Sequence, residues 1–299
     1  MNLRIWSFTL ILFLSLSAFS QKANKYLINP LPVSWTEADT VFQQILPIDD
    51  HWWKAFEDPM LDSLISVAVK QNYSVLTAIN RMDMAKANLR IERGSYYPSL
   101  ALSGGWTKQQ TSGNTSTIPQ AKEHYFDAAL STSWEADIFG SIRNRVKAQK
   151  ETFMASQEEY NATMVSLCAQ VASGYINLRQ LQQELDVVRK NCASQEEVLK
   201  ITEVRYNTGL VSKLDVLQAK SVYYSTKASI PTIEAGIIQY INSLAVLLGV
   251  YPADLRSSLE KIGPLPDYME LVSVGIPANL LRRRPDVRGA ERTVNAQAA

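Results

Sequence analysis

The sequence predicts a mainly α-helical chain with a membrane β-hairpin in its first half. From Pro119 to Pro231 there is no proline, and glycine occurs there only at Gly140, Gly174 and Gly209. A helix several times longer than a globular domain needs can therefore form. Beside this stretch, two segments alternate apolar and polar residues, as strands with one apolar face do. A strand pair of this kind, leading into a very long helix, suits a wall that begins in a membrane and continues outside it as a tube.

The first residues predict export across the inner membrane. Arg4 precedes an apolar run from Ile5 to Leu16, and Ala18-Phe19-Ser20 fits a cleavage site, so residues 1–20 are predicted to be a signal peptide. The run is shorter than the roughly 20 residues of a membrane-spanning helix. There is no cysteine near the cleavage site, so we expect no lipid anchor. No later segment is read as a transmembrane helix.

Composition and motifs exclude several function classes. The net charge of +1 favours neither nucleic acid nor an anionic surface as the partner. Cys168 and Cys192 fall on one predicted helix about 36 Å apart, too far for a disulfide, so we expect small core residues. His51 and His124 lie in separate segments without metal-ligand spacing. No nucleophile elbow, P-loop or dinucleotide motif is found, so we predict no enzyme, no metal and no cofactor.

The N-terminal third is predicted to be an arm followed by helices. Residues 21–50 are rich in Pro, Asn, Asp and Thr and predict an extended arm. Residues 51–97 show two helical stretches, the first with an apolar stripe through Leu61, Leu64 and Ile65. Ser74 is a candidate N-cap for the second.

Residues 98–138 predict a β-hairpin. In each segment the apolar residues share one parity and polar residues the other. Each strand has the roughly ten residues that a tilted strand needs to cross a bilayer, with aromatic residues near its ends. A half-buried strand of any antiparallel sheet fits the same alternation. Two strands alone would leave backbone groups unpaired in lipid, so the barrel must close with further strands of this chain or of other subunits. The residues expected to face lipid are Leu100, Leu102, Trp106, Phe126, Leu130 and Trp134.

Residues 141–250 predict a long α-hairpin. Apolar residues recur at seven-residue steps from Phe153 to Val188, with a second row four residues on, which is a coiled-coil seam. A further stripe beside it predicts neighbours on both flanks, as in a closed ring of helices, although a dimeric coiled coil or bundle fits the same pattern. That stripe comprises Ala162, Val165, Ala169, Ala172 and Ile176. The acidic pairs Glu158-Glu159 and Glu196-Glu197 are assigned to solvated helix faces.

A sharp reversal is predicted between the two long helices. Gly209 suits a position with positive φ just after a helix. Ser212 is a natural N-cap, with Asp215 at the third helical position near the positive end of the helix dipole. Pro231 should kink the return helix or divide it.

Residues 251–299 are predicted to be a linker followed by the start of a second repeat. Val75 and Ala78 match Val287 and Ala290 in spacing, a faint internal repetition. The basic cluster Arg282-Arg283-Arg284 is expected at a helix end or subunit contact, because an exported protein does not meet nucleic acid.

Five segments together resemble the outer-membrane efflux factors of the TolC/OprM type, and the similarity covers nearly all of the mature chain. They include an opening-helix motif, the start of the first strand, a strand-to-helix junction, a helix-tip motif and the start of a second repeat. The segments are Trp53 with Phe56-Glu57-Asp58-Pro59-Met60-Leu61 and Asn72, then Tyr97-Pro98-Ser99-Leu100, Trp134-Glu135-Ala136-Asp137-Ile138-Phe139-Gly140, Arg205 to Ala219, and Leu281 to Glu291.

The resemblance implies a TolC-like α-barrel and β-barrel, made of long coiled-coil helices and the strands of a shared trimeric barrel. Residues 51–299 would be the channel domain. Such homotrimers dock onto a periplasmic adaptor and, through it, an inner-membrane pump of the RND type, and drugs or other small solutes leave through the lumen. We therefore expect an outer-membrane protein of a Gram-negative cell. Because the similarity ends just inside the second repeat, we also expect this sequence to be a fragment.

The resemblance also implies functional residues at the turn between the long helices. Gly209, Leu210, Val211 and Ser212 would form the tip that meets the adaptor. Asp215, beside that tip, matches the position at which relatives make polar links that hold the entrance closed.

Two other functions remain open from the residues alone. A periplasmic adaptor also contains a long helical hairpin, but it should carry flanking lipoyl-like β segments, which are not seen. A secreted coiled-coil structural protein is the second alternative. It would not need strands with an outward apolar face.

Overall fold

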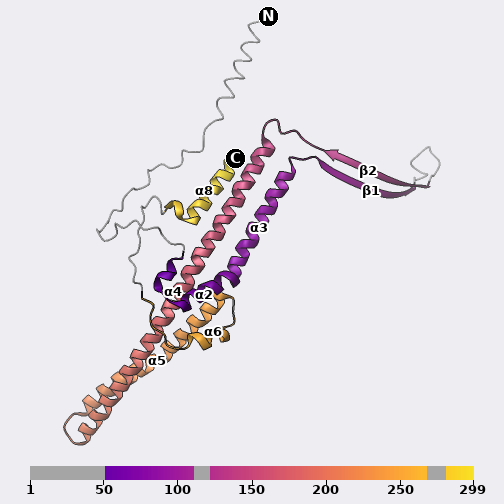
Figure 1. Ribbon diagram of the computed structural model, residues 1–299. Helices are drawn as coiled ribbons and strands as arrows, with labels where there is room; N and C mark the ends of the chain where they lie inside the picture. The colour runs from indigo at the N-terminus through magenta and orange to yellow at the C-terminus, as the bar shows by residue number, and fades with distance from the viewer. Residues whose placement is uncertain (1–50, 111–121, 268–280) are drawn as a thin grey trace, which may run out of the picture. The chain divides into compact units, whose positions relative to one another are not determined.

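The computed structural model describes residues 51–110, 122–267 and 281–299 (Figure 1). The predicted signal peptide, the arm and the loop between the strands lie outside the described residues. Contacts divide the chain into two compact units. One unit comprises the described parts of residues 28–81 and 157–288, and the other comprises those of 82–156 and 289–299. Each unit is described separately below.

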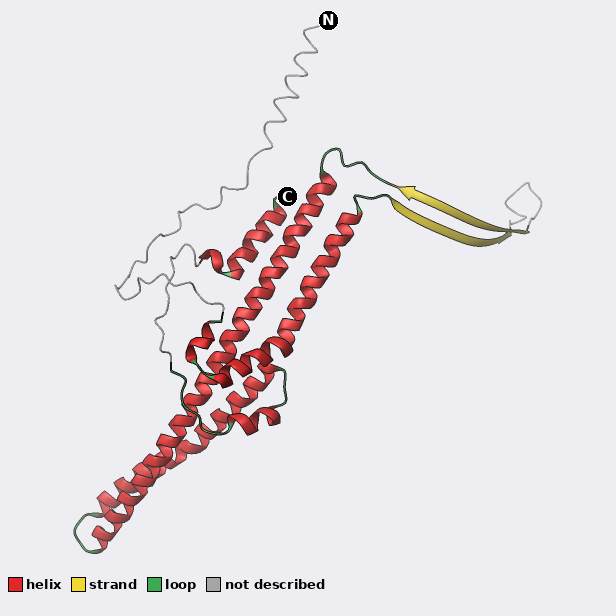
Figure 2. Ribbon diagram, in the orientation of Figure 1, coloured by secondary structure: helices red, strands yellow, loops and turns green. Residues whose placement is uncertain are grey.

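The described elements are mostly helical, as predicted, with one two-stranded sheet (Figure 2). The long helices α3 and α4 run through both units. The elements in order are η3 (Trp52–Phe56), α2 (Pro59–Gln71), α3 (Tyr73–Gly94), β1 (Ser99–Gln110), β2 (Lys122–Ser133), α4 (Ser141–Asn207), α5 (Lys213–Leu248), α6 (Pro252–Leu259) and α8 (Pro285–Gln297).

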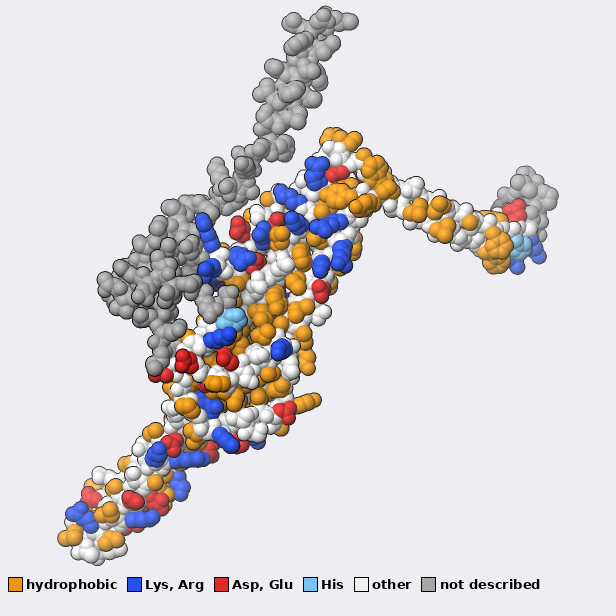
Figure 3. All heavy atoms as spheres, in the orientation of Figure 1, with side chains coloured by type: hydrophobic (Ala, Val, Ile, Leu, Met, Phe, Trp, Pro, Cys, Tyr) orange, Lys and Arg blue, Asp and Glu red, His pale blue; other side chains and the backbone are white. Residues whose placement is uncertain are grey.

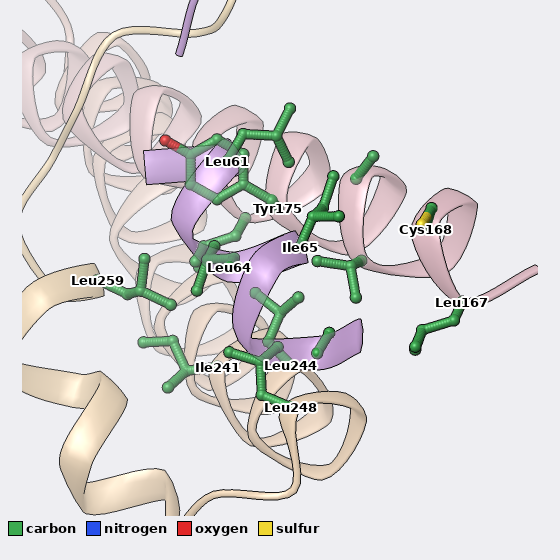
Figure 4. Close-up of a cluster of buried hydrophobic side chains, with 14 of the residues drawn as sticks. Leu61, Leu64, Ile65, Leu167, Cys168, Tyr175, Ile241, Leu244, Leu248 and Leu259 are labelled. Atoms are coloured by element: carbon green, nitrogen blue, oxygen red, sulfur yellow. The ribbon is translucent and has the colours of Figure 1, made fainter. Parts of the chain in front are cut away.

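The core of the first unit forms where α2 crosses α4 and α5 (Figure 4). Leu61 and Ile65 of α2 meet Leu178 of α4 and Leu244 of α5, and α6 adds Leu259. All five are almost completely buried. Burying each such side chain contributes about 1.5–3 kcal/mol, so this short helix fixes α4 near its middle and α5 near its C-terminal end.

The helices α4 and α5 form an antiparallel hairpin that extends beyond this core. Near the tip of this hairpin the two helices pack through a second, small cluster of Leu199, Val216 and Tyr223. Cys192 packs against this cluster, while Cys168 is buried in the main core, and both thiols are free as predicted.

The return helix is not divided at Pro231, so that alternative of the prediction was wrong. α5 continues through this residue as a single helix. A proline removes one backbone hydrogen bond and crowds the preceding turn. α5 has 36 residues, so the loss of one hydrogen bond is local. Ile230 and Ile233, on either side of Pro231, pack in or against the core, and this packing outweighs the loss.

By length and composition, α5 is the one helix among the described residues that could cross a membrane, which the sequence reading did not anticipate. Its residues Ile237, Ile241, Leu244 and Leu248 are buried against α2 and α4. Glu234, on the same helix, forms an ion pair with α4. These contacts are those of a packed hairpin helix.

The second unit contains the strand pair and the first turns of α4. β1 and β2 pair antiparallel over their full length, from Ser99 opposite Ser133 to Gln110 opposite Lys122. Asp137 then starts α4, since its carboxylate oxygens accept hydrogen bonds from the backbone N–H groups of Ile142 (3.1 Å) and Arg143 (2.9 Å). This cap satisfies donors that the first turn of a helix leaves free.

Candidate functional site

The hairpin has one strongly apolar face. The register places Leu102 opposite Leu130 and Trp106 opposite Phe126, and residues two apart on a strand share a face. The rings of Trp106 and Phe126 lie 6.4 Å apart. Leu100, two residues before Leu102, continues the same face. Five of the six residues predicted to face lipid are therefore on one surface within the strands.

Trp134, the sixth, follows the last residue of β2. Its indole Nε1–H donates a hydrogen bond to the backbone carbonyl of Tyr96, 3.2 Å away. Tyr97, next to Tyr96, is largely exposed. Aromatic residues therefore border the apolar face at the end where the strands join the helices, as they also do near the turn through Trp106 and Phe126.

No residue that the structure describes covers the apolar face. Leu102 is 80% exposed and Phe126 83%. A soluble protein seldom leaves so continuous an apolar surface in water. The opposite face is polar, and there the carboxylate of Asp127 lies over Gly105: a Cβ on that glycine would stand 2.7 Å from Asp127 Oδ1. The hairpin thus has one apolar face and one polar face.

The tip between α4 and α5 is a tight reversal held by its own backbone. Gly209 has φ +77°, a conformation that a side chain disfavours. The N–H of Leu210 returns to the carbonyl of Arg205 at 2.8 Å, which closes the end of α4. Leu210 is exposed, and Val211 is partly so. The four predicted tip residues are therefore consecutive on one exposed turn.

Ser212 and Asp215 cap each other at the start of α5. Ser212 N–H and Oγ–H donate to Asp215 Oδ2, both at 2.8 Å, and Asp215 N–H donates to Ser212 Oγ at 3.3 Å. This reciprocal capping box satisfies free donors of the first turn. The hydrogen bonds from the Ser212 side chain and backbone lower the pKa of the Asp215 carboxyl. Asp215 is thus an ionised carboxylate with one oxygen already engaged in the cap.

One acidic pair differs from the solvated faces predicted for it. Glu159 is exposed and pairs with Arg81 at 3.0 Å. Glu158, its neighbour, is buried, accepts from Asn161 at 3.1 Å, and pairs with Arg288 at 2.5 Å. Assigning Glu158 to a solvated face was wrong, because successive residues on a helix point about 100° apart. At the basic cluster, Arg284 pairs with Asp286 at 2.6 Å beside the start of α8.

A buried polar network near the core was missed by sequence reasoning. Tyr175 donates to Asp58 Oδ2 at 2.7 Å and accepts from Arg179 Nε at 3.1 Å. Arg179 Nη1 also donates to Gln182 and to the carbonyl of Lys261, each at 2.8 Å. Burial and the hydrogen bond to Asp58 raise the pKa of the Tyr175 phenol, which remains a donor. The network fastens the segment after α6 onto α4.

The outward flanks of the helical hairpin carry apolar residues that the described part of the chain leaves uncovered. Val246 is 75% exposed, and Leu214, Leu217, Ile201 and Val204 near the tip are also exposed. One groove beside α4 is lined in part by Ala162 and another by Ala169, both from the predicted second stripe.

Within the part of the chain that the structure describes, no group of His, Cys, Asp and Glu side chains could hold a metal ion. His51 directly precedes η3, whereas His124 lies in β2.

Comparison with known proteins gives a consistent family. The model of the family described as outer membrane efflux protein matches residues 64–250. Nodulation protein T of Rhizobium leguminosarum bv. trifolii is 31% identical over 272 residues, covering 88% of this chain and 56% of its own length. The probable efflux pump outer membrane protein TtgC of Pseudomonas putida is 28% identical over 274 residues, covering 89% and 56%. This chain therefore spans a little over half the length of these curated relatives.

Comparison with solved structures gives the same family of channels. The outer-membrane channel OprN superposes with a TM-score of 0.81 at 27% identity, covering 90% of this chain and 60% of that one. CusC, described as forming a transmembrane channel, gives 0.71 at 25% identity, covering 90% and 59%.

Proposed function

Because the chain belongs to the outer membrane efflux protein family, we propose that it is part of the outer-membrane channel of a tripartite efflux system. The channel is a passive exit duct for drugs or other small solutes in a Gram-negative cell. No covalent bond is made or broken in such a duct, so no residue of the chain needs a catalytic role. The relatives whose names mention efflux pumps and outer membranes support this proposal.

The observation that carries the proposal is the one-sided hairpin. Its large apolar side chains gather on one face and are exposed, while Asp127 and serines occupy the other. In a barrel wall the first face meets acyl chains and the second a polar lumen. Both outer edges of the pair lack partners in the described chain. Lipid does not tolerate open edges, so the hairpin joins further strands in a closed barrel. That this barrel is shared by a homotrimer is what the family resemblance implies.

The helical hairpin continues the wall into the periplasm. Its uncovered apolar flanks, with Val246 and Leu217 among them, are the surfaces on which neighbouring helices of the trimer pack. The exposed turn of Gly209, Leu210, Val211 and Ser212 is the docking tip for a periplasmic adaptor. Through this adaptor an inner-membrane pump of the RND type delivers solutes to the lumen.

Asp215 is proposed to contribute to gating. Its carboxylate is ionised, lies at the first turn of α5 beside the tip, and has Oδ2 engaged by Ser212. The other oxygen can link to a neighbouring helix in the closed state. Adaptor contact then favours an open state by binding it more tightly.

The two alternative functions predict a different location. A periplasmic adaptor or a secreted coiled-coil protein has no use for the exposed apolar face around Leu102 and Phe126.

Cell fractionation of the full-length protein tests the proposal. We expect it in the sarkosyl-insoluble outer membrane, and as a trimer after extraction in mild detergent. Recovery as a soluble monomer after osmotic shock, or in the inner membrane, would contradict the proposed function.

A further inference from the structure

The charged residues of the hairpin are sorted by sign between its two faces. Lys108, Lys122 and His124 share the face of the exposed leucines, whereas Glu123 and Asp127 lie on the other. The assignment follows from the register, because directly opposite residues and residues two apart share a face. Figure 3 shows basic side chains gathered at the turn end of the hairpin beside hydrophobic ones.

The three basic residues are close neighbours. Lys108 is directly opposite His124, and Lys122 is two positions away from His124 on the same strand. Such neighbours stand about 5 Å and about 7 Å apart. The Trp106 ring stacks on His124 with centroids 6.4 Å apart and planes 11° from parallel. The cluster therefore borders the aromatic end of the apolar face.

No acidic side chain of the hairpin neutralises this cluster. Glu123 is turned to the other face, where it accepts a hydrogen bond from Gln109 at 3.0 Å. Asp127 lies over Gly105 on that same face. Neither lysine forms an ion pair within the described residues, and residues 111–121 contain no Asp or Glu. Lys108 and Lys122 are diagonal neighbours across the strand pair, so their two positive charges lie close together without a counter-charge on the hairpin and favour an anion from outside it.

The depth of the cluster in a membrane indicates which anion. From Leu100 to Lys108 the strand advances about 26 Å, which at the roughly 40° tilt of barrel strands covers about 20 Å of the roughly 25 Å apolar band of an outer-membrane barrel. The lysine stems extend the ammonium groups further toward water. This end of the hairpin is the one away from α3 and α4, because those helices connect to the Ser99 and Ser133 ends. With periplasmic helices, the cluster reaches the headgroups of the outer leaflet.

We propose that Lys108, Lys122 and His124 bind a phosphate group of lipid A in the outer leaflet. The inference rests on the proposed function, since only an outer-membrane hairpin brings the cluster to that leaflet. A phosphate supplies the missing negative charge and several acceptor oxygens for ammonium and imidazole donors. The acyl chains of the same lipid then lie along Trp106 and the leucines of the apolar face.

Lipid titration of the purified full-length trimer in neutral detergent, followed by native mass spectrometry, tests the proposal. The probes are lipid A with its phosphates, dephosphorylated lipid A, and phosphatidylglycerol. The test variant is Lys108→Gln with Lys122→Gln. The control, Ser103→Glu with Thr107→Glu, changes the net charge by the same amount on the opposite face. We expect phosphorylated lipid A to bind the wild type most tightly. The lysine variant should bind it about 30-fold more weakly, from roughly fivefold per lysine near a charged surface, with the control unchanged.

Equal binding of lipid A by the wild type and the lysine variant would overturn the proposal, as would equal loss in the control. Binding of dephosphorylated lipid A or phosphatidylglycerol as tight as that of lipid A would overturn the assigned ligand. Outer-membrane fractionation of the wild type is read separately. A wild type in the outer membrane without a lysine effect refutes only the lipid A site, whereas a wild type outside that membrane refutes the proposed function.

Discussion

At the scale of single residues, Asp215 has two proposed roles, and a single substitution of this residue would remove both at once. It is half of a capping box with Ser212, and it is the proposed gating carboxylate. Losing the cap frays the start of α5, whereas losing a link between helices widens the entrance. The two effects separate because Ser212 contributes to the cap but carries no charge.

We predict that Asp215→Ala in the full-length protein raises single-channel conductance and sensitivity of cells to vancomycin, because a charged link at the entrance is lost. Ser212→Ala is the matched control, since it removes the cap and keeps the carboxylate. It should leave both readouts near wild type. Equal increases in the two variants would assign the effect to the cap alone.

The cap itself should be sensitive to acid. The pKa of Asp215 is lowered by its hydrogen bonds with Ser212. Its stabilising contribution is therefore complete above the ordinary carboxyl pKa of about 4 and is lost as the pH falls through the lower folded value. In the wild type, hydrogen exchange at the first turn of α5 should rise in that acidic range. In Asp215→Ala it should not change there.

The buried phenol of Tyr175 gives a second prediction at this scale. Tyr175→Phe leaves an oxygen of Asp58 and Nε of Arg179 without this partner. An unsatisfied buried polar group costs about 1–3 kcal/mol, so thermal unfolding should occur at a lower temperature. Tyr160→Phe is the control, because Tyr160 packs against the same core without belonging to the network. An equal effect of the two substitutions would contradict a role for the network.

At the scale of elements, the geometry of the tip follows from local sequence, whereas its proposed role comes from the family resemblance. The positive φ of Gly209 and the cap of Ser212 depend on residues within one turn of each other, which is why the motif was predicted correctly. The hairpin register follows similarly from the alternation of apolar residues.

We predict that Gly209→Trp blocks adaptor docking without preventing trimer formation. The substitution forces a bulky side chain into a conformation that favours glycine and distorts only the exposed turn. Cross-linking to the adaptor should be lost, while the trimer remains visible in native gels. Retained cross-linking would refute the docking role. Leu210→Ala, which keeps the backbone, tests whether the apolar side chain contributes.

Other features of the elements could not be predicted from sequence because they depend on distant residues. Arg179 reaches the carbonyl of Lys261, 82 positions away. Glu158 and Glu159 are identical neighbours, yet only one is turned toward Arg288. Pro231 carries a local signal for a break, and tertiary packing overrides it.

At the scale of the whole molecule, the family and the mainly helical fold were predicted from motifs and periodicity, and both are confirmed. Which partners cover the apolar flanks cannot be derived from one chain, because the covering residues belong to other helices. Val246 and Leu217, which are exposed here, are the positions that those partners should bury.

The central claim is that lipid wets one face of the hairpin and water the other. Leu102→Cys and Ser103→Cys, each in a background with Cys168→Ala and Cys192→Ala, place a spin label on opposite faces of β1. In reconstituted bilayers, the label at 102 should be relaxed by oxygen and protected from a water-soluble nickel chelate, and the label at 103 should show the reverse. Equal access of the chelate to both positions would contradict the account.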